Sequence, residues 1–338
     1  MLDPIAFACR LIDVPSPSDN ELAMAELLER ELTVLGYTTT RHDVSDTRFN
    51  LLARAGGAPR VVLNSHLDTV PPWFASSQDE EHIYGRGACD TKGVIAAMIA
   101  AGERLRARGI HDFAFLFVVG EETDSIGAKT ANVAFANLGS EYVVVGEPTG
   151  SVFARASKGA LTCTVRFEGI AAHSAYPQLG ESAINRMVAA IAEINATDWG
   201  RHEVLGNATV NVGVVRGGQK PNIVPAEAEC EMIFRLVTTP EEVQAKLESI
   251  VARYRGRVIL SRGNAPQFMV VPAGQESVVV AFNTDVPWLT NLGKPLLFGP
   301  GSILDAHGKN EKIKKSDLLA AVAIYEEMVV ALLEGRVS

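Results

Sequence analysis

Residues 61–72 read VVLNSHLDTVPP, a run of β-branched and aliphatic residues that stops at a histidine and, two positions later, an aspartate. A short apolar run without alternation is typical of a strand buried on both faces of a parallel sheet. Two later segments have the same form, FAFLFVVG at 113–120 and YVVVGE at 142–147, and a helical pattern at 92–108 has the length of a parallel crossover. These segments predict an α/β fold with a mostly parallel central sheet.

The middle of the chain has a different pattern. From residue 157, alternating strands and amphipathic helices follow the order β-α-β-β-α-β of a ferredoxin-like domain, at 159–169, 181–195, 207–218, 226–237, 238–254 and 256–262. The α/β pattern then resumes with a strand at 294–301 and a helix at 316–335. We therefore expect a discontinuous catalytic domain of residues 1–156 and 264–338, interrupted by an α+β lid or dimerisation domain at 157–263.

Composition narrows the class of protein. A net charge of −9 argues against a general affinity for nucleic acid. The longest uncharged apolar stretch, VIAAMIAAG at 94–102, is much shorter than the ~20 residues that span a bilayer. The four cysteines are scattered without a C-x-x-C pair, which argues against a disulfide framework or a cysteine zinc site. We expect a soluble cytoplasmic protein that acts on a small molecule and binds neither nucleic acid nor membranes.

Side chains that bind metals follow each of the three buried runs: His66 and Asp68, Glu121 and Glu122, and Glu147. In open α/β sheets, ligands gather just beyond the carboxyl ends of the strands. His66 and Asp68 are two residues apart and face the same way in an extended chain, so one can bind a metal while the other holds its imidazole. The adjacent glutamates point to opposite sides, so one can bind a metal while the other faces its water.

Two more candidates lie in glycine-rich segments. Asp90, in GRGACDTKG, precedes a helix and is expected both to cap it and to be shared between two ions. His307, in FGPGSILDAHGKNE, follows another strand and can close the site. Two histidines with several carboxylates suit zinc, with manganese or cobalt as substitutes.

Each of these residues, taken alone, more often has an ordinary structural role. A histidine after a strand is most often a loop residue, paired glutamates are usually a solvated turn, and an aspartate before a helix is usually a cap. Their joint placement at strand ends favours a metal site. Nucleotide motifs fail, because Asp90 replaces the third glycine of a dinucleotide fingerprint and Lys92 is followed by glycine instead of Ser or Thr.

The chain resembles the acetylornithine deacetylase, succinyl-diaminopimelate desuccinylase and carboxypeptidase G family of di-zinc aminoacylases. The matching segments occur in family order and span most of the chain: SHLDTVP, YGRGACDTKG, GEETDSIGAK, VVGEPTG, KGALTCTVRFEGIAAHSAYPQLGESAI, PNIVPAEAECEMIFR and FGPGSILDAHGKNE. The resemblance implies two zinc ions, with Asp90 bridging them, His66 and Glu147 on one, and Glu122 and His307 on the other. It also implies that Asp68 orients His66 and that Glu121 is the general base.

The resemblance also implies roles for residues of the lid. In the family the lid forms a homodimer, and His173 matches a histidine that reaches the oxyanion in the partner's site. Arg235 and Asn222 match residues that hold the substrate's carboxylate or polar backbone. Lys158 lies in the segment SKGAL. This segment matches the lysine-glycine form that is typical of acetylornithine deacetylases. Gly299 and Gly301 match the glycine loop that lines the acyl pocket.

The resemblance implies hydrolysis of an N-acyl amino acid to a carboxylate and a free amine. N-acetylornithine, a substrate of arginine biosynthesis, is the first choice. Alternatives are succinyl-diaminopimelate, lysine or ornithine attached to a carrier protein, and dipeptides. A protein of another class, a non-catalytic binding module with the same fold, would be expected to lack a ligand or the base, and all of those positions are filled here.

Overall fold

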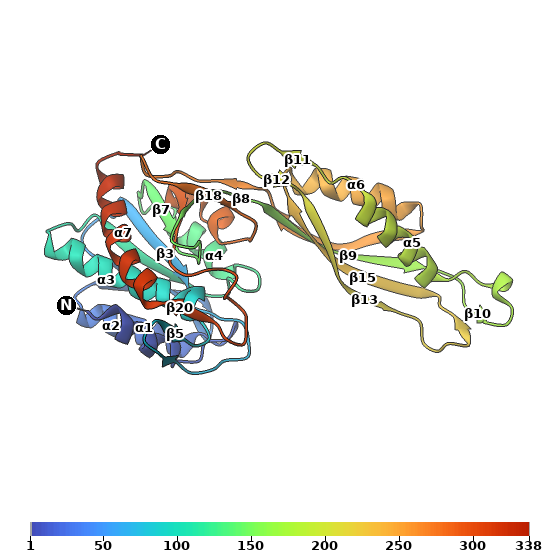
Figure 1. The fold of residues 1–338 in the computed structure, drawn as a ribbon, viewed down its shortest axis with the longest axis horizontal. Helices are drawn as coiled ribbons and strands as arrows, with labels where there is room; N and C mark the ends of the chain where they lie inside the picture. Colours follow the sequence, from blue (N-terminus) through green and yellow to red (C-terminus); the bar gives the residue numbers. More distant parts are fainter. Residues whose placement is uncertain (1, 338) are drawn as a thin grey trace. The chain divides into compact units, whose positions relative to one another are not determined.

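The structure is a computed structural model and describes residues 2–337. The chain divides into two compact units, drawn in Figure 1. Unit 1 comprises Met1–Arg155, Phe268–Val278 and Thr284–Ser338, and unit 2 comprises Ala156–Gln267 and Val279–Asn283. The lid was expected at 157–263; unit 2 extends to residue 267 and includes a short return segment. No helix in the part of the chain that the structure describes is long and apolar enough to cross a bilayer.

Unit 1 is built on a nine-stranded sheet within the described residues. The strand order is β1 (Thr38–Ser45), β2 (Arg48–Arg54), β6 (Phe113–Val118), β3 (Val61–His66), β7 (Tyr142–Val145), β19 (Lys294–Leu297), β8 (Phe153–Ser157) and β17 (Gln267–Phe268), and β18 (Ser277–Val280) pairs with β8. The four central strands β6, β3, β7 and β19 are parallel. The pairs β1–β2, β2–β6 and β19–β8 are antiparallel, so the centre of the sheet is parallel, as expected, and the sheet as a whole is mixed.

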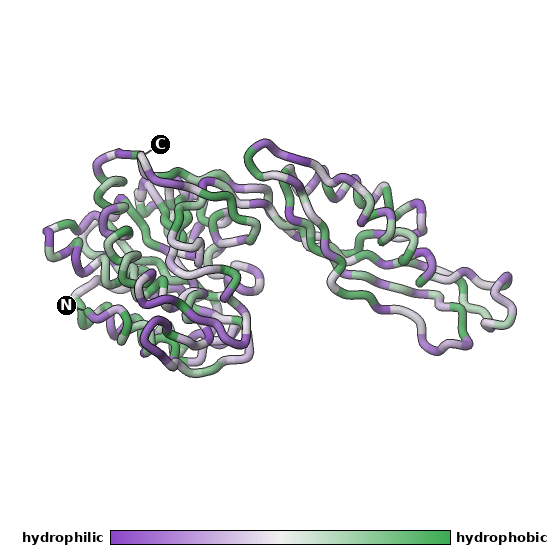
Figure 2. Tube along the Cα trace, viewed as in Figure 1, coloured by the Kyte–Doolittle hydropathy of each residue, from purple (hydrophilic) through white to green (hydrophobic). Residues whose placement is uncertain are grey.

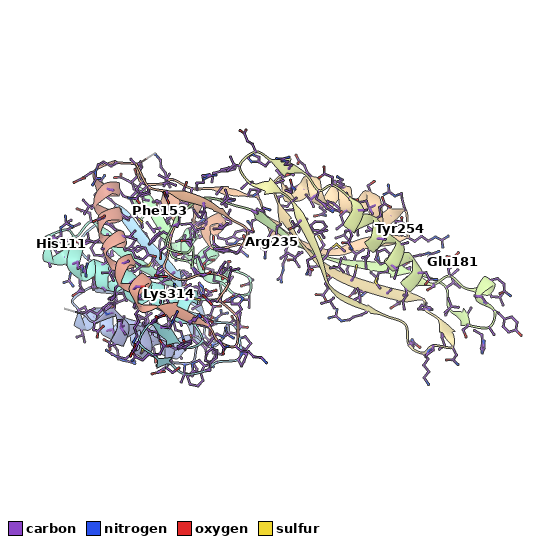
Figure 3. All side chains as sticks on the ribbon, in the orientation of Figure 1. His111, Phe153, Glu181, Arg235, Tyr254 and Lys314 are labelled. Carbon is purple, nitrogen blue, oxygen red and sulfur yellow. The ribbon has the colours of Figure 1, made fainter. Side chains whose placement is uncertain are left out.

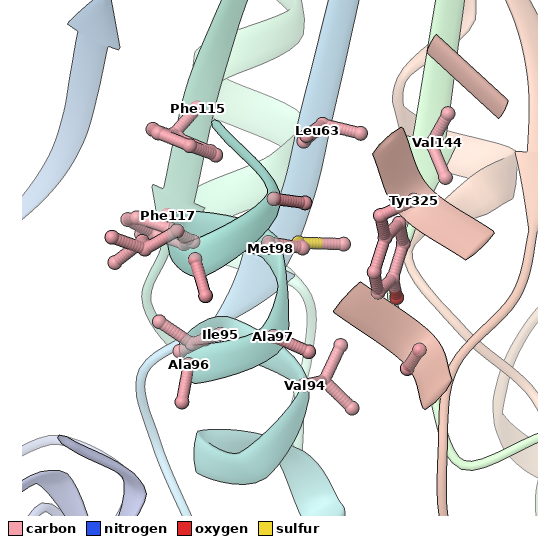
Figure 4. Close-up of a cluster of buried hydrophobic side chains, with 14 of the residues drawn as sticks. Leu63, Val94, Ile95, Ala96, Ala97, Met98, Phe115, Phe117, Val144 and Tyr325 are labelled. Carbon is pink, nitrogen blue, oxygen red and sulfur yellow. The ribbon is translucent and has the colours of Figure 1, made fainter. Parts of the chain in front are cut away.

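Helices cover both faces of this sheet. On one face, α1 (Pro4–Ile12), α2 (Leu22–Val34), α3 (Gly93–Ala107) and α7 (Lys315–Leu333) share one core with the strands. Figure 4 shows part of it, where Val94 and Met98 of α3 lie among Leu63 of β3, Phe115 of β6 and Tyr325 of α7. The helix α4 (Ile126–Ala134) packs near β1, β2 and β6 together with two short turns, η3 (Val286–Trp288) and η4 (Thr290–Leu292).

A small three-stranded sheet in unit 1 supports the segment before α3. Its strands are β4 (Ser77–Gln78), β5 (His82–Tyr84) and β20 (Lys312–Lys314), and β5 lies between the other two. The irregular turn η1 (Ala88–Lys92) follows β5. This pairing brings residues 312–314 next to residues 82–84, which are more than two hundred positions earlier in the chain.

Unit 2 has the expected β-α-β-β-α-β order. Its elements are β9 (Gly159–Glu168), α5 (Ala183–Ala196), β13 (Thr209–Gly217), β15 (Glu227–Leu236), α6 (Pro240–Ala252) and β16 (Gly256–Asn264). The sheet order is β13-β15-β9-β16, with every neighbouring pair antiparallel. Both helices pack on the face that carries the apolar residues of β9 and β15, so the opposite face is half-exposed and polar. Figure 2 shows the polar residues at the turns.

Short elements complete unit 2. The pairs are β10 (Ala172–His173) with β14 (Ile223–Val224), and β11 (Arg201–His202) with β12 (Gly206–Asn207). A short turn, η2 (Pro177–Leu179), lies between β10 and α5. The strand β10 carries His173, and β14 follows Asn222 directly.

Candidate metal centre

The parallel pairing of three strands brings the first ligand candidates together. In the register of β3 with its neighbours, His66 lies beside Val118 of β6, and Asn64 lies beside Val145 of β7. Glu121 and Glu122 therefore follow β6 on one side of His66, and Glu147 follows β7 on the other. His66 and Glu147 are buried, at 1% and 4% exposed.

Asp90 lies between two histidines that come from distant parts of the chain. Its Oδ1 is 3.0 Å from His66 Nε2, and its Oδ2 is 3.3 Å from His307 Nε2. Each carboxylate oxygen thus faces a different imidazole. This is the arrangement that a carboxylate shared between two cations requires.

A glutamate lies near each histidine. Glu122 Oε1 is 3.0 Å from His307 Nε2, and Glu147 Oε1 is 3.9 Å from His66 Nε2. Overlapping sets of ligand atoms lie within 4.8 Å of one another; they are His66, Asp90 and Glu122, and His66, Glu121 and Glu147. These two sets share His66, and the Asp90 contacts with His66 and His307 connect them to a further pair, Glu122 and His307. Because Glu121 belongs to one close set, geometry alone allows it to be a ligand or a base.

The electrostatics of the cluster fit divalent cations. Burial, reinforced by repulsion from the neighbouring carboxylate, raises the pKa of Glu121 and of Glu147 well above the ordinary value for glutamate. Hydrogen bonds to Asp90 and Glu122 raise the pKa of His307 to about 10. Buried like charges at this separation are costly unless cations neutralise them. Two imidazoles with an excess of carboxylates are a suitable donor set for zinc.

Asp68 was expected to orient the His66 imidazole, and it also binds groups beyond that imidazole. Its Oδ1 is 3.5 Å from His66 Nδ1, and its backbone oxygen is 3.0 Å from the same nitrogen. Its carboxylate also accepts hydrogen bonds from the backbone N–H groups of Glu121 and Glu122, at 3.1 and 3.2 Å, and from the Ser18 hydroxyl at 2.8 Å. One carboxylate therefore connects the ends of β3 and β6.

Asp90 is not a helix cap, contrary to expectation. The helix α3 begins at Gly93 with Lys92 at its N-cap position, and Asp90 has non-helical torsions, φ −125° and ψ 83°. Its backbone N–H donates to Glu311 Oε1 at 3.2 Å. The turn that carries Asp90 is therefore fixed by a contact from the far end of the chain instead of by the helix.

Two glycines permit close contact between loops of the cluster. A Cβ on Gly299 would lie 2.4 Å from the Glu147 backbone oxygen, and a Cβ on Gly301 would lie 2.8 Å from Cys89 Cβ. Gly301 also has a left-handed φ of +82°. Both residues are needed for packing beside Glu147 and the turn before Asp90; their assignment to an acyl pocket remains a prediction.

Asp285 is a buried acid that the sequence reasoning missed. It is 1% exposed, and its Oδ1 has no hydrogen-bond partner among the described residues. Burial raises its pKa to about 6, and its charge contributes to the raised pKa of Glu121 and Glu147. The local sequence NTDVPW resembles an ordinary turn, so the burial of Asp285 could have been found only from tertiary structure.

In unit 2, His173 lies in the small β10–β14 pair, and Asn222 directly precedes β14. His173 pairs with Ile223, and Ser174 donates its N–H to the Asn222 backbone oxygen at 3.1 Å. His173 Nδ1 accepts a hydrogen bond from the Ala175 N–H at 3.1 Å. A neutral imidazole with this contact carries its proton on Nε2, which is then available as a donor to an anion.

The two basic candidates of unit 2 differ in their contacts. Lys158 Nζ donates to the Asn207 backbone oxygen at 2.5 Å and so holds the β11–β12 hairpin. Arg235, on β15 and labelled in Figure 3, is partly buried, and no carboxylate of residues 2–337 pairs with it. Burial lowers the pKa of its guanidinium. Of the two, Arg235 has the side chain that is free to bind an anion.

Comparison with known proteins identifies the family. The model of a peptidase dimerisation domain of M20 peptidases matches residues 155–257. An M20 domain-containing peptidase of Schizosaccharomyces pombe is 36% identical over 332 residues, covering 95% of this chain and 82% of that protein. The chain belongs to the M20 peptidase family. A probable carboxypeptidase of Aspergillus flavus is 35% identical to this M20 chain over 376 residues, covering 97% of the chain and 90% of the relative.

Solved structures show the same fold. A tripeptidase of Staphylococcus aureus superposes on this M20 chain with a TM-score of 0.81 at 20% identity, covering 97% of each chain. A dinuclear metal-binding M20 peptidase of Bacillus subtilis superposes with a TM-score of 0.70 at 18% identity, covering 98% of each. The predicted fold class, a zinc-peptidase-like α/β domain with an inserted lid, is confirmed. As an M20 peptidase, the chain is a metallohydrolase that acts on amide bonds.

Proposed function

We propose that this M20 chain hydrolyses the amide bond of an N-acyl amino acid, with N-acetylornithine as the first substrate to test. The observation that carries the proposal is the position of Asp90, whose two oxygens face His66 and His307 at 3.0 and 3.3 Å. Two ligand sets that share one carboxylate suit a pair of cations. Such a pair suits hydrolysis of a stable amide.

Five side chains would hold the cations: His66, Asp90, Glu122, Glu147 and His307. When bound, a zinc pair would lower the pKa of a water and polarise the scissile carbonyl. The metal is assigned to zinc from the donor types, and cobalt or manganese would serve as substitutes. The separation of the two histidines by Asp90 supports one ion on each side.

Three further residues would take part in the reaction, two of them directly and Asp68 through Glu121. Glu121 would accept a proton from the attacking water and pass it to the departing amine. Asp68 would keep Glu121 in place through the backbone N–H that it binds. His173 would donate its Nε2 proton to the developing oxyanion, because its Nδ1 is already occupied by the Ala175 N–H.

Arg235 supports a substrate with a free carboxylate. A guanidinium that is partly buried and has no acidic partner among the described residues is costly to keep unless it binds an anion. An N-acyl amino acid and a peptide C-terminus both supply that anion. The relatives described as probable carboxypeptidases favour a second candidate, removal of the last residue of a short peptide. Succinyl-diaminopimelate and carrier-linked lysine or ornithine are the other candidates to test.

A substrate comparison would decide between these candidates. Zinc-loaded protein should be assayed with N-acetylornithine, N-acetylcitrulline, succinyl-diaminopimelate and simple dipeptides, each also with its α-carboxylate amidated. We expect kcat/KM to be highest for N-acetylornithine and to fall about 10-fold or more on amidation. Arg235→Lys should raise KM, because an ammonium group cannot bind a carboxylate through two parallel hydrogen bonds. Equal rates for free and amidated substrates would remove the carboxylate requirement.

A homodimer through the lid belongs to the same proposal. The outward face of α5 carries small, uncharged side chains. The exposed residues on it are Asn185, Val188, Ala189, Ala192, Asn195 and Ala196. The exposed face of α6 instead carries charges, including Glu241, Lys246 and Arg253. Beside α5, the outer strand β13 exposes Val215. An uncharged helix face beside an outer strand suits a second copy of this chain.

A cytoplasmic location, compatible with the free cysteines, is also proposed.

Mixing inactive variants would test a site shared between subunits. His173→Ala and Glu121→Ala proteins should each be inactive, whereas an exchanged mixture should regain about a quarter of wild-type activity, since half of randomly paired dimers are mixed and each has one complete site. Val188→Arg should prevent the recovery and yield monomers in sedimentation. Ser249→Arg, on the exposed face of α6, is the matched control. No recovery despite confirmed subunit exchange would assign His173 to its own subunit or to no site.

A further inference from the structure

Glu311 is a buried acid four residues after His307, and it holds the turn that carries Asp90. Its side chain is 0% exposed. Its Oε1 accepts hydrogen bonds from the backbone N–H groups of Gly87, Cys89 and Asp90 at 2.9, 3.3 and 3.2 Å. One oxygen therefore fixes three donors of a turn that is more than two hundred residues away in sequence.

Arg86 connects Glu311 to the segment that carries His307. Its Nη1 donates to Glu311 Oε2 at 2.6 Å, its Nη2 donates to the His307 backbone oxygen at 3.4 Å, and its Nε donates to the Pro72 backbone oxygen at 3.2 Å. The arginine side chain is 2% exposed. The pair therefore joins the Asp90 turn to the His307 loop through buried contacts.

These contacts hold the loop of His307, which is not held by a regular strand or helix. Its side chain is 49% exposed, and its backbone has a left-handed φ of +62°. His66, by contrast, is the last residue of a buried central strand and is held by that strand. The position of His307 relative to Asp90 thus depends on the loop's anchorage, whereas the position of His66 does not.

We propose that Glu311 and Arg86 are positioning residues that set the distance between Asp90 and His307, and so shape the cation site that these ligands form with Glu122. This inference rests on the proposed function, because it assumes that Asp90 and His307 bind a cation. A pair that only stabilises the fold would loosen both cation sites equally. A positioning pair would weaken the site of Glu122 and His307 more than the site of His66 and Glu147, because Asp90 is shared whereas His307 belongs to the first site alone.

The test is a titration of metal-free protein with Co²⁺, followed by visible absorption and calorimetry. Wild-type protein should bind in two steps. Glu311→Gln keeps an acceptor oxygen but loses the charge that pairs with Arg86. Arg86→Lys cannot reach Glu311, His307 and Pro72 together. In each variant we expect one step to weaken about 10- to 100-fold, with an altered spectrum, and the other step to weaken much less.

Arg106→Lys is the matched control. Arg106 is partly buried, donates to the Leu35 backbone oxygen and lies over the Tyr37 ring at 4.6 Å, so this substitution also removes fixed arginine contacts. It is in the last turn of α3, about 20 Å along the helix from Gly93 at ~1.5 Å per residue. Both cobalt steps should stay unchanged in the control, even if its unfolding temperature falls.

The outcomes separate the inference from the proposed function. Wild-type binding in folded Glu311→Gln and Arg86→Lys proteins would refute the positioning role and leave the function standing. Equal weakening of both steps would reduce the pair to a general stabiliser and also refute it. A wild-type protein that binds no Co²⁺ would overturn the proposed function and the inference with it. If Glu311→Gln does not fold, Arg86→Lys decides alone.

Discussion

Replacing Glu121 with glutamine is expected to lower kcat by about 10²- to 10⁴-fold while the protein still folds and binds both cations. Glutamine has the same shape but cannot accept the proton of the attacking water. The backbone N–H of residue 121 would still donate to Asp68, so the loop should keep its conformation. Steady-state kinetics and elemental analysis of the same preparation would measure both effects.

Glu122→Gln is the matched control, because it changes the adjacent residue in the same way. Glu122 lies 3.0 Å from His307 and is assigned as a ligand, so its substitution should weaken one cation site and lower metal content. The pair of variants resolves the ambiguity that geometry leaves, since Glu121 lies within 4.8 Å of ligand atoms of His66 and Glu147. Loss of a cation from Glu121→Gln would make Glu121 a ligand, and unchanged turnover would exclude it as the base.

Removing the metal with a chelator is expected to abolish turnover and to reverse the pH dependence of stability. In metal-free protein, His307 has a pKa of about 10, and Glu121 and Glu147 have raised values, compared with ~6.5 and ~4.3 for ordinary histidine and glutamate. Between about pH 5 and 8 the folded state therefore holds more protons than the unfolded state, and its free energy of unfolding falls as pH rises. Asp68 and Asp90 have lowered pKa values, so they change the free energy of unfolding only below this pH range.

Metal-loaded protein should show the opposite trend. Its ligands must be deprotonated to bind, so acid releases the cations and lowers stability. Thermal unfolding at about pH 5.5 and about pH 8, with and without chelator, would measure both trends. Added zinc should restore turnover. Parallel pH trends in the two forms, or full turnover after exhaustive chelation, would contradict the assignment of these carboxylates and histidines as ligands.

Local sequence signals predicted much of the fold. Asp3 Oδ1 accepts the Ile5 N–H at 3.0 Å at the start of α1, and Thr239 caps α6 before Pro240. Such caps depend on neighbouring residues only, so they are visible in sequence. The ligand candidates could be found because the carboxyl ends of parallel strands meet at one edge of the sheet. The residues that follow the three strands therefore lie close together.

The rest depended on contacts between distant segments. The hairpin β1–β2 was missed because its first strand, TTTRHDVS, is polar and largely exposed. Asp90 was expected to cap α3. Instead, its backbone N–H donates a hydrogen bond to Glu311, which is more than two hundred residues away in sequence. Asp285 and Glu311 have no local pattern that distinguishes them from surface acids. Their burial follows from tertiary packing, which neither spacing nor periodicity encodes.

The outer strand β13 has an unpaired edge, on which we expect a protomer without a partner to aggregate. Nothing in the described sheet pairs with its outer edge, and Val215 on it is 57% exposed. Unpaired strand edges add further strands from any available chain. Variants that weaken self-association, such as Val188→Arg, should therefore be handled cold, dilute and freshly purified, because slow precipitation would otherwise be mistaken for loss of catalytic competence.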